Sequence, residues 1–304
     1  HHAQCMHIAL KILLPDIKNL FFMVSNKKKN PQSIEGLAVR EIDDWAEGYR
    51  TVPVLVAVSG VYFREISESL KERKFSNIIN GVFGGSFDND VRERYFQRHF
   101  ISGKAWFQTL DSAGEIKKYP KTDIGIYIAK SAADKKLKNE PPMPEYGHTV
   151  QAGAALSKER SVGCRDDVGE NISERNKNYC ECTVTYYIWK HAEEAFVGLW
   201  HYRRRFLWNQ RDIEILRSGK VDAVLPYPVI TVKGKYAIHY QPYVDERAYH
   251  VMLSVLKENY PDYYRTAMEV MRGDSFYPCN IVAAKREIFA EYAGWLFEIL
   301  EKVE

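Results

Sequence analysis

A histidine, a tyrosine and three arginines follow directly on an apolar run in this sequence. The stretch 196–206 reads FVGLWHYRRRF, and its first part is typical of a buried strand. Arginine presents a planar fork of donors that stays charged, which suits phosphate oxygens. If 195–200 is a central strand of an α/β sheet, the residues after it lie at the edge where such sheets bind ligands. That edge would carry His201, Tyr202, Arg203 and Arg204. A phosphate site and a solvated basic turn are equally good interpretations.

Two adjacent carboxylates, Asp166 and Asp167, lie in the polar segment RDDVGENISERN at 165–176. They could hold a cation, orient a sugar or take a proton from a hydroxyl. The alternative is an acidic loop in which aspartates cap turns. Gly169 and Asn171 nearby favour the functional interpretation, with Asp167 as the base.

Other polar residues are weaker candidates. Asn280 lies in the apolar run 275–284 and must find hydrogen bonds if it is buried, so a ligand contact and a structural contact are equally plausible. His239 and Asp245 fall in a predicted loop, where most charges are merely solvated. The literal Asp-x-Asp at 88–90 precedes a helical run, which favours a helix start.

The elements that must position these residues form two α/β regions. In the first, an apolar run at 52–59, a helical pattern at 61–75 and a second apolar run at 76–80 predict a right-handed parallel crossover. The run 20–26 predicts an earlier strand. The polar segment 111–123 marks a boundary. We therefore expect a partial, truncated Rossmann-like α/β domain at 1–115 and a second domain at 116–304.

The second region alternates strands and helices, which predicts an α/β fold with a mainly parallel sheet. Strands are expected at 124–130, 195–200, 221–228 and 275–284. A helix is expected after Ser173 as its cap, with a core stripe of side chains at helical spacing. That stripe consists of Tyr179, Val184, Ile188 and Ala192. Further helices are expected near 209–218, 245–258 and 261–272, and at the end of the chain.

The composition is that of a globular protein, with 304 residues, 45% hydrophobic and 27% charged. A net charge of +3 argues weakly against nucleic-acid binding. Five cysteines without framework spacing indicate free thiols in a reducing compartment. No membrane span or signal peptide is visible. Both ends look like cuts, so we expect a piece of a longer protein.

Several motifs together resemble a known family. GLWHYRRRF is similar to the GL-x-HYRRYF signature of the bacterial family called domain of unknown function 4422. Similar segments follow the family's order over roughly 124–304: VQAGAAL, RDDVGENISERNKNYCECTVTYYIWKH, DAVLPYP and NIVAAKREIFAEYAGWLFEIL. The chain departs from the family pattern at Ala129-Lys130-Ser131, at Arg205 and at Pro278-Cys279.

The resemblance implies a glycosyltransferase with a GT-A-like sheet, which transfers a sugar from a UDP-type donor to a capsular or exopolysaccharide acceptor. The acceptor would be a saccharide or a lipid-linked saccharide. Most such enzymes place an Asp-x-Asp and a divalent cation at the strand end that here carries arginines. Arg203 and Arg204 could supply that positive charge without metal. No cofactor is certain, and Mn²⁺ or Mg²⁺ on Asp166 and Asp167 is the alternative.

The resemblance also distributes the site residues. The expected catalytic residues are Asp166 and Asp167, and the expected donor-binding residues are Gln151, Gly153, Asn171, His201, Tyr202, Arg203, Arg204 and Asn280. His239 and Asp245 are expected on the acceptor side. The expected location is the cytoplasm, with peripheral association at the inner face of the membrane left open. The competing hypothesis is a non-catalytic nucleotide- or glycan-binding module that positions a partner enzyme.

Overall fold

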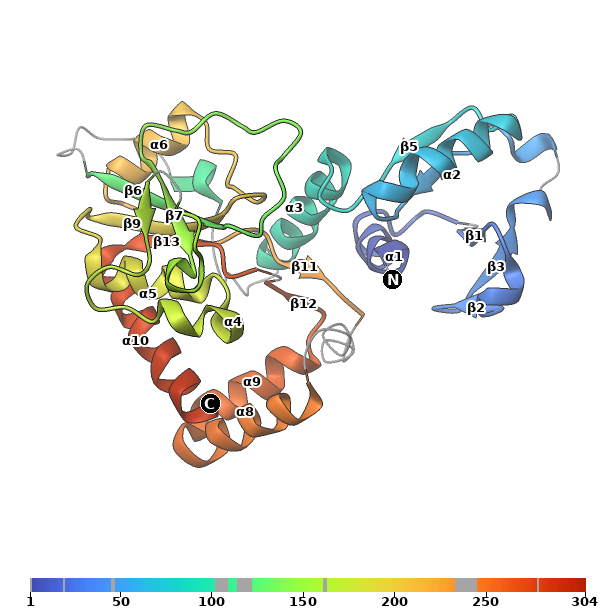
Figure 1. The fold of residues 1–304 in the computed structure, drawn as a ribbon. Coiled ribbons are helices and arrows are strands. Elements are labelled where there is room, and N and C mark those ends of the chain that lie inside the picture. Colours follow the sequence, from blue (N-terminus) through green and yellow to red (C-terminus); the bar gives the residue numbers. More distant parts are fainter. Residues whose placement is uncertain are drawn as a thin grey trace. The chain divides into compact units, whose positions relative to one another are not determined.

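The computed structural model of the chain describes residues 2–18, 20–44, 47–101, 109–113, 122–160, 163–232, 245–277 and 279–304. These residues form two compact units, which are described separately (Figure 1). The second unit takes in the described residues of 109–226, 245–264 and 279–304. It contains the residues that the sequence singled out for chemistry, apart from His239, which lies outside the described residues.

A six-stranded sheet organises the second unit, in the order β10-β13-β9-β6-β7-β8. Its strands are β6 (Ile124–Ser131), β7 (Gly147–Ala152), β8 (Cys164–Arg165), β9 (Phe196–His201), β10 (Ala223–Val224) and β13 (Val282–Lys285). The first four pair in parallel, and β13 runs antiparallel to both β9 and β10. The expectation of a mainly parallel sheet with a central strand at 195–200 is confirmed.

The strand order reverses between β6 and β9. The chain proceeds from β6 to β7 and β8 on one side and then crosses to β9 on the other side. Ala129 of β6 pairs with His201 of β9, so the two strands end at the same edge. The crevice at such a reversal is where open α/β sheets bind ligands. The fold therefore places the 201–204 segment beside the expected ligand position.

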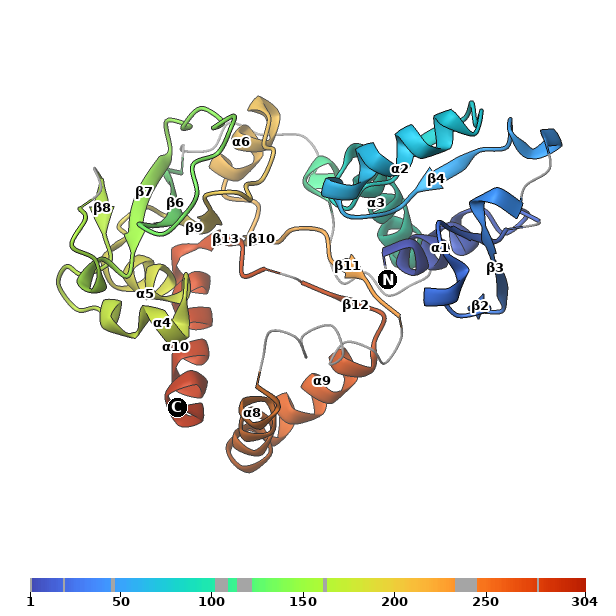
Figure 2. The ribbon, with the colours of Figure 1, turned by 45° about the vertical axis from the view of Figure 1, so that its right-hand side comes forward.

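Helices cover both faces of this sheet (Figure 2). On one face lie α5 (Cys182–His191) and α10 (Arg286–Val303), whose side chains complete one core cluster. On the other face lies α6 (Gln210–Arg217), with Ile213 and Leu216 in the second cluster. Outside α10, α8 (Glu246–Asn259) packs against it. The sheet is thus held between apolar layers, which leaves its edges for polar side chains.

The helix expected after Ser173 is broken. Its predicted stripe of Tyr179, Val184, Ile188 and Ala192 is buried as expected. The chain, however, forms α4 (Asn176–Tyr179), then bends at Cys180, where φ is +48°, before α5 begins. The Asn176 amide donates to the Cys180 carbonyl and to Thr183 Oγ1, which stabilises the bend. Ser173 is not the helix cap but part of the 3₁₀ turn η6 (Ser173–Arg175).

The strand expected at 275–284 is two strands. β12 (Ser275–Phe276) pairs with β11 (Val229–Ile230), and both lie in the first unit. β13 begins only at Val282, in the other unit. Asn280 lies just before β13 rather than inside a strand, because the chain passes from one sheet to another here. The prediction of one continuous strand was wrong.

The first unit contains the predicted crossover. β4 (Val54–Val56) and β5 (Ile78–Asn80) pair in parallel, and α2 (Gly60–Glu72) connects them. The segment 20–26 holds β1 (Phe22–Val24), which pairs with β3 (Leu37–Glu41) in a separate three-stranded sheet with β2 (Ser33–Ile34). A second core joins α1 (His2–Leu13) and α3 (Ser86–Ile101) with Ile230 of β11. Asp88 lies in the first turn of α3 and accepts the Gly84 N–H, as a helix start requires.

The first unit also takes later parts of the chain. Its described residues are those up to Ile101 together with 227–232 and 265–277, so α9 (Pro261–Arg272) contributes to both units. A boundary at 111–123 does not anticipate these later segments, and the division into domains 1–115 and 116–304 stays a prediction. The remaining short turns are η1 (Lys27–Lys29), η2 (Ile42–Asp44), η3 (Glu47–Tyr49), η4 (Leu110–Ala113) and η5 (Ala154–Leu156). None of the described helices is long and apolar enough to cross a bilayer.

Candidate functional site

The run of charge after β9 is a tight turn. The backbone N–H groups of His201 and Arg204 each donate to the other residue's carbonyl at 3.1 Å. The Tyr202 N–H donates to the Ala129 carbonyl of β6, also at 3.1 Å. Tyr202 and Arg203 therefore occupy the tip of the turn, next to the end of β6. The backbone itself directs the arginines to the edge where the strand order reverses.

Arg203 and Arg204 are both exposed. In the described part of the chain, no carboxylate lies within ion-pair distance of either guanidinium. Arg203 lies over the Tyr202 ring at 5.0 Å, which orders the side chain without using its N–H donors. Arg205 is different, because its guanidinium donates to the carbonyls of Pro141 and Pro142. Two of the three arginines thus keep their donors for something else.

His201 meets Asn280 and Glu181 beside the turn. Its Nε2 lies 2.9 Å from Asn280 Oδ1 and 3.3 Å from Glu181 Oε1. The Asn280 amide donates to Cys182 Sγ at 3.4 Å. Burial raises the pKa of the Cys182 thiol to about 12, so the thiol is neutral at pH 7. The structure therefore brings together two predicted site residues, His201 and Asn280, with two that the sequence did not single out.

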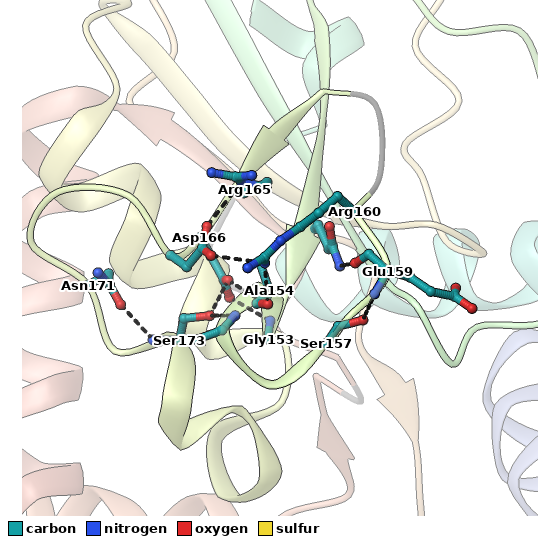
Figure 3. A network of polar contacts seen from close by, with 12 residues as sticks. Gly153, Ala154, Ser157, Glu159, Arg160, Arg165, Asp166, Asn171 and Ser173 are labelled. Carbon is teal, nitrogen blue, oxygen red and sulfur yellow. Dashed lines mark hydrogen bonds and ion pairs between the residues drawn. The ribbon is translucent and has the colours of Figure 1, made fainter.

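Asp166 lies at the centre of a second network, formed by the loops after β7 and β8 (Figure 3). Its side chain is fully buried. One carboxylate oxygen accepts the Gly153 N–H at 2.8 Å and the Thr183 hydroxyl at 2.6 Å. The other accepts the Ala154 N–H at 3.0 Å and the Ser173 hydroxyl at 2.5 Å. Four donors satisfy the carboxylate, so a cation or substrate would have to displace them. This geometry favours a loop-shaping role, and the catalytic role of Asp166 stays a prediction.

The neighbouring Asp167 is held between two arginines. Its oxygens lie 3.0 Å from Arg160 and 3.1 Å from Arg165, and its side chain is 13% exposed. Arg160 also donates to the Ala154 carbonyl, which ties the ion pair to the Asp166 loop. A carboxylate paired with two cations is a poor proton acceptor, because both cations favour its charged form. The role of Asp167 as base also stays a prediction.

Three predicted donor-binding residues shape these loops. Gly153 has φ +65°, and a Cβ there would lie 2.6 Å from Asn176 Oδ1, so a larger residue fits neither the backbone nor the space. Gln151 is buried and donates to the Glu159 carbonyl. Asn171 accepts the Ser173 N–H and donates to the Gly169 carbonyl, which closes a local turn. Their contacts in the structure are with the protein's own backbone.

Asp245, expected on the acceptor side, caps α8. Its carboxylate accepts the Arg247 N–H at 2.8 Å and pairs with the same residue's guanidinium. This is the solvated alternative that the sequence had left open. Across the residues that the structure places, no three His, Cys, Asp or Glu side chains gather closely enough to hold a metal.

Sequence reasoning missed the partners of these networks. Thr183 and Ser173 are buried hydroxyl residues whose sequence positions give no sign of a shared carboxylate. A polar residue such as Thr183 within an apolar helix face is the one available signal. Glu181 resembles any solvated helix residue, because the bend at Cys180 that presents it to His201 has no pattern in the sequence.

Comparisons with known proteins place the chain in a family. The apo structure of the bifunctional glycosyltransferase WbbM is similar to it with a TM-score of 0.48 and 25% sequence identity. This similarity covers 60% of the present chain and 37% of that one, so the chain spans little more than a third of its length. No curated protein matches the sequence. Residues 132–304, more than half of the chain, match the model of the Domain of unknown function (DUF4422). The chain belongs to the DUF4422 family.

Proposed function

We propose that the chain is a glycosyltransferase that moves a sugar from a nucleotide-diphosphate donor of the UDP type to a growing capsular or exopolysaccharide acceptor. The observation that carries this proposal is the turn at 201–204. It presents Arg203 and Arg204 with unused donors at the edge where the sheet order reverses. Arginine forks in such a position suit the oxygens of a diphosphate.

The reaction requires positive charge at the leaving group. When the bond from the anomeric carbon to the diphosphate breaks, negative charge grows on the phosphate oxygens. Two guanidinium groups fixed beside those oxygens stabilise that charge without reorganising during the reaction. In this proposal Arg203 and Arg204 take the role that a divalent cation has in other enzymes. The ring of Tyr202 keeps Arg203 in place.

The proposed acceptor is a saccharide or lipid-linked saccharide, and the proposed location is the cytoplasm, with association at the inner membrane face. The competing function is a binding module that positions a partner enzyme. Slow hydrolysis of a UDP-sugar by the purified chain separates the two, because a binding module has no means of breaking the donor bond.

The test is isothermal titration of UDP into the wild-type chain and into Arg203→Ala and Arg203→Lys. A charge-assisted contact contributes about 1.5–3 kcal/mol, so Arg203→Ala should weaken UDP binding about 10- to 150-fold. Lysine should restore it only in part, because it keeps the charge and loses the fork. EDTA should leave wild-type affinity nearly unchanged.

Arg211 provides the matched control, since it is an exposed arginine of the same unit, on α6. Arg211→Ala removes the same charge at a distance from the turn and should bind UDP like the wild type. Manganese-dependent affinity, with normal binding by Arg203→Ala, would contradict the proposal. It would return the donor site to Asp166 and Asp167.

A further inference from the structure

The Asn280 side chain fixes the proton on His201. Its amide nitrogen donates to Cys182 Sγ, so its oxygen faces His201 Nε2 at 2.9 Å. An oxygen at that distance accepts a hydrogen bond and requires that Nε2 carry hydrogen. In the neutral ring, Nδ1 then holds the lone pair. Among the described residues, Nδ1 has no hydrogen-bond partner.

Glu181 stands ready to stabilise the protonated ring. Its Oε1 lies 3.3 Å from Nε2, and its side chain is 33% exposed against 14% for His201. The bend at Cys180 places Glu181 directly before α5. A carboxylate beside an imidazole favours the charged form that follows proton uptake. A base needs this stabilisation, whereas a residue that only fills space does not.

The other titratable groups around this cluster leave Glu181 as the one negative charge among those the structure describes. Burial raises the pKa of Cys182 and of Tyr292 on α10 to about 12. Burial also raises the pKa of Cys279, and that of Cys180 beside Glu181. All four are neutral at pH 7. The charges of the turn, Arg203 and Arg204, oppose a charged ring, so Glu181 has to offset them.

We propose that His201 is the general base of the transfer, with Asn280 and Glu181 as positioning residues. This inference rests on the proposed function and deepens it. The proton of the acceptor hydroxyl passes to His201 Nδ1 while the acceptor oxygen bonds to the anomeric carbon. The bond from that carbon to the diphosphate breaks, and its electron pair leaves with UDP. The imidazolium then returns its proton to solvent. In the absence of acceptor, water takes the acceptor's place.

The same unit holds a second histidine–glutamate pair that serves as a control. His148 Nε2 lies 3.2 Å from Glu194 Oε1, nearly the distance found at His201. This pair lies at the start of β7, and the Tyr127 hydroxyl donates to the same carboxylate at 2.9 Å. It is far along the strands from the ligand edge. The two pairs differ in place rather than in chemistry.

The experiment uses the full chain and the UDP-hexose that the wild type hydrolyses in a panel of UDP-glucose, UDP-galactose and their N-acetyl forms. Hydrolysis is measured from pH 5 to 9, and UDP binding by titration, for the wild type, His201→Gln, Glu181→Gln and His148→Gln. His201→Gln should lose roughly 100-fold or more in kcat, with UDP affinity within about threefold of the wild type.

Glu181→Gln gives the sharper readout, because it keeps the shape of the side chain and removes only its charge. The acidic limb of the pH–rate profile should move to lower pH, by roughly half a pH unit for a partly exposed pair. The maximal rate should fall as well, because the base is weaker. His148→Gln should leave both the limb and the rate unchanged.

Each outcome bears on one proposal. A wild type that neither binds UDP nor hydrolyses any donor refutes the transferase function itself. An active wild type with an unmoved limb in Glu181→Gln refutes only the base assignment. If UDP affinity falls as much as the rate in His201→Gln, His201 is a donor contact and not the base.

Discussion

Two loops at the same edge of the six-stranded sheet use their charges in opposite ways. After β8, the Asp166 carboxylate accepts four hydrogen bonds from the protein, and Asp167 pairs with two arginines. After β9, Arg203 and Arg204 are exposed, without a carboxylate partner among the described residues. A polar group satisfied within the protein adds to stability, whereas an unsatisfied exposed one is available to a ligand. The contrast separates residues that build the site from residues that use it.

The strongest test of this contrast is Asp166→Ala. The change leaves two backbone N–H groups and two hydroxyls without an acceptor in a buried position. Each unsatisfied group costs about 1–3 kcal/mol, so the loss of unfolding free energy should be about 4 kcal/mol or more. Urea unfolding monitored by circular dichroism measures it. Asp222→Ala, which removes an exposed carboxylate paired with Lys285, should cost less than about 1 kcal/mol.

A stable Asp166→Ala protein that binds UDP but hydrolyses no donor would break the comparison. Asp166 would then be a catalytic residue, as the sequence predicted, and the four hydrogen bonds would be incidental to its role.

Gly153→Ala should have an intermediate effect. The left-handed backbone, with φ +65°, and the approach of Asn176 to the position of a Cβ both oppose a side chain here. Strain of this kind costs of order 1–3 kcal/mol. The shift of the urea midpoint measures it, with Gly219→Ala as the control. Gly219 has a similar φ of +71° but only a Thr122 contact at 3.5 Å. A larger loss at Gly219 would show that packing against Asn176 is unimportant.

The smallest expected effect belongs to the turn. Replacing both Arg203 and Arg204 by alanine should change the unfolding free energy by no more than about 0.5 kcal/mol, because neither side chain is tied to a carboxylate. The same variant should bind UDP poorly. A loss of stability comparable to that of Gly153→Ala would mean that the arginines support the fold, and the distinction between the two loops would disappear.

Patterns within short segments predicted much of this fold. The apolar run at 196–200 and the helical stripe from Tyr179 to Ala192 were placed correctly, because burial repeats at a fixed spacing along one element. The turn at 201–204 followed from charge that comes directly after a buried strand.

What the sequence did not reveal depends on contacts between distant residues. Nothing around Asp166 indicates that Thr183, 17 positions later, donates to it. Nothing in the run 275–284 marks the point where the chain leaves one sheet for another. The bend at Cys180 goes against local helix propensity and is held by Asn176. Tertiary contacts of this kind override local preference, and a single sequence does not record them.

The late segments of the first unit have a consequence for how the protein is made. The buried Tyr95 hydroxyl donates to Asp274, and Ile230 completes the core around α1 and α3. A ribosome synthesises α1 and α3 long before it reaches either partner. The apolar surface that awaits β11 and β12 therefore stays uncovered while most of the chain is translated. The growing chain needs protection from aggregation during that interval, and an expression clone that ends near residue 115 would keep that surface uncovered permanently.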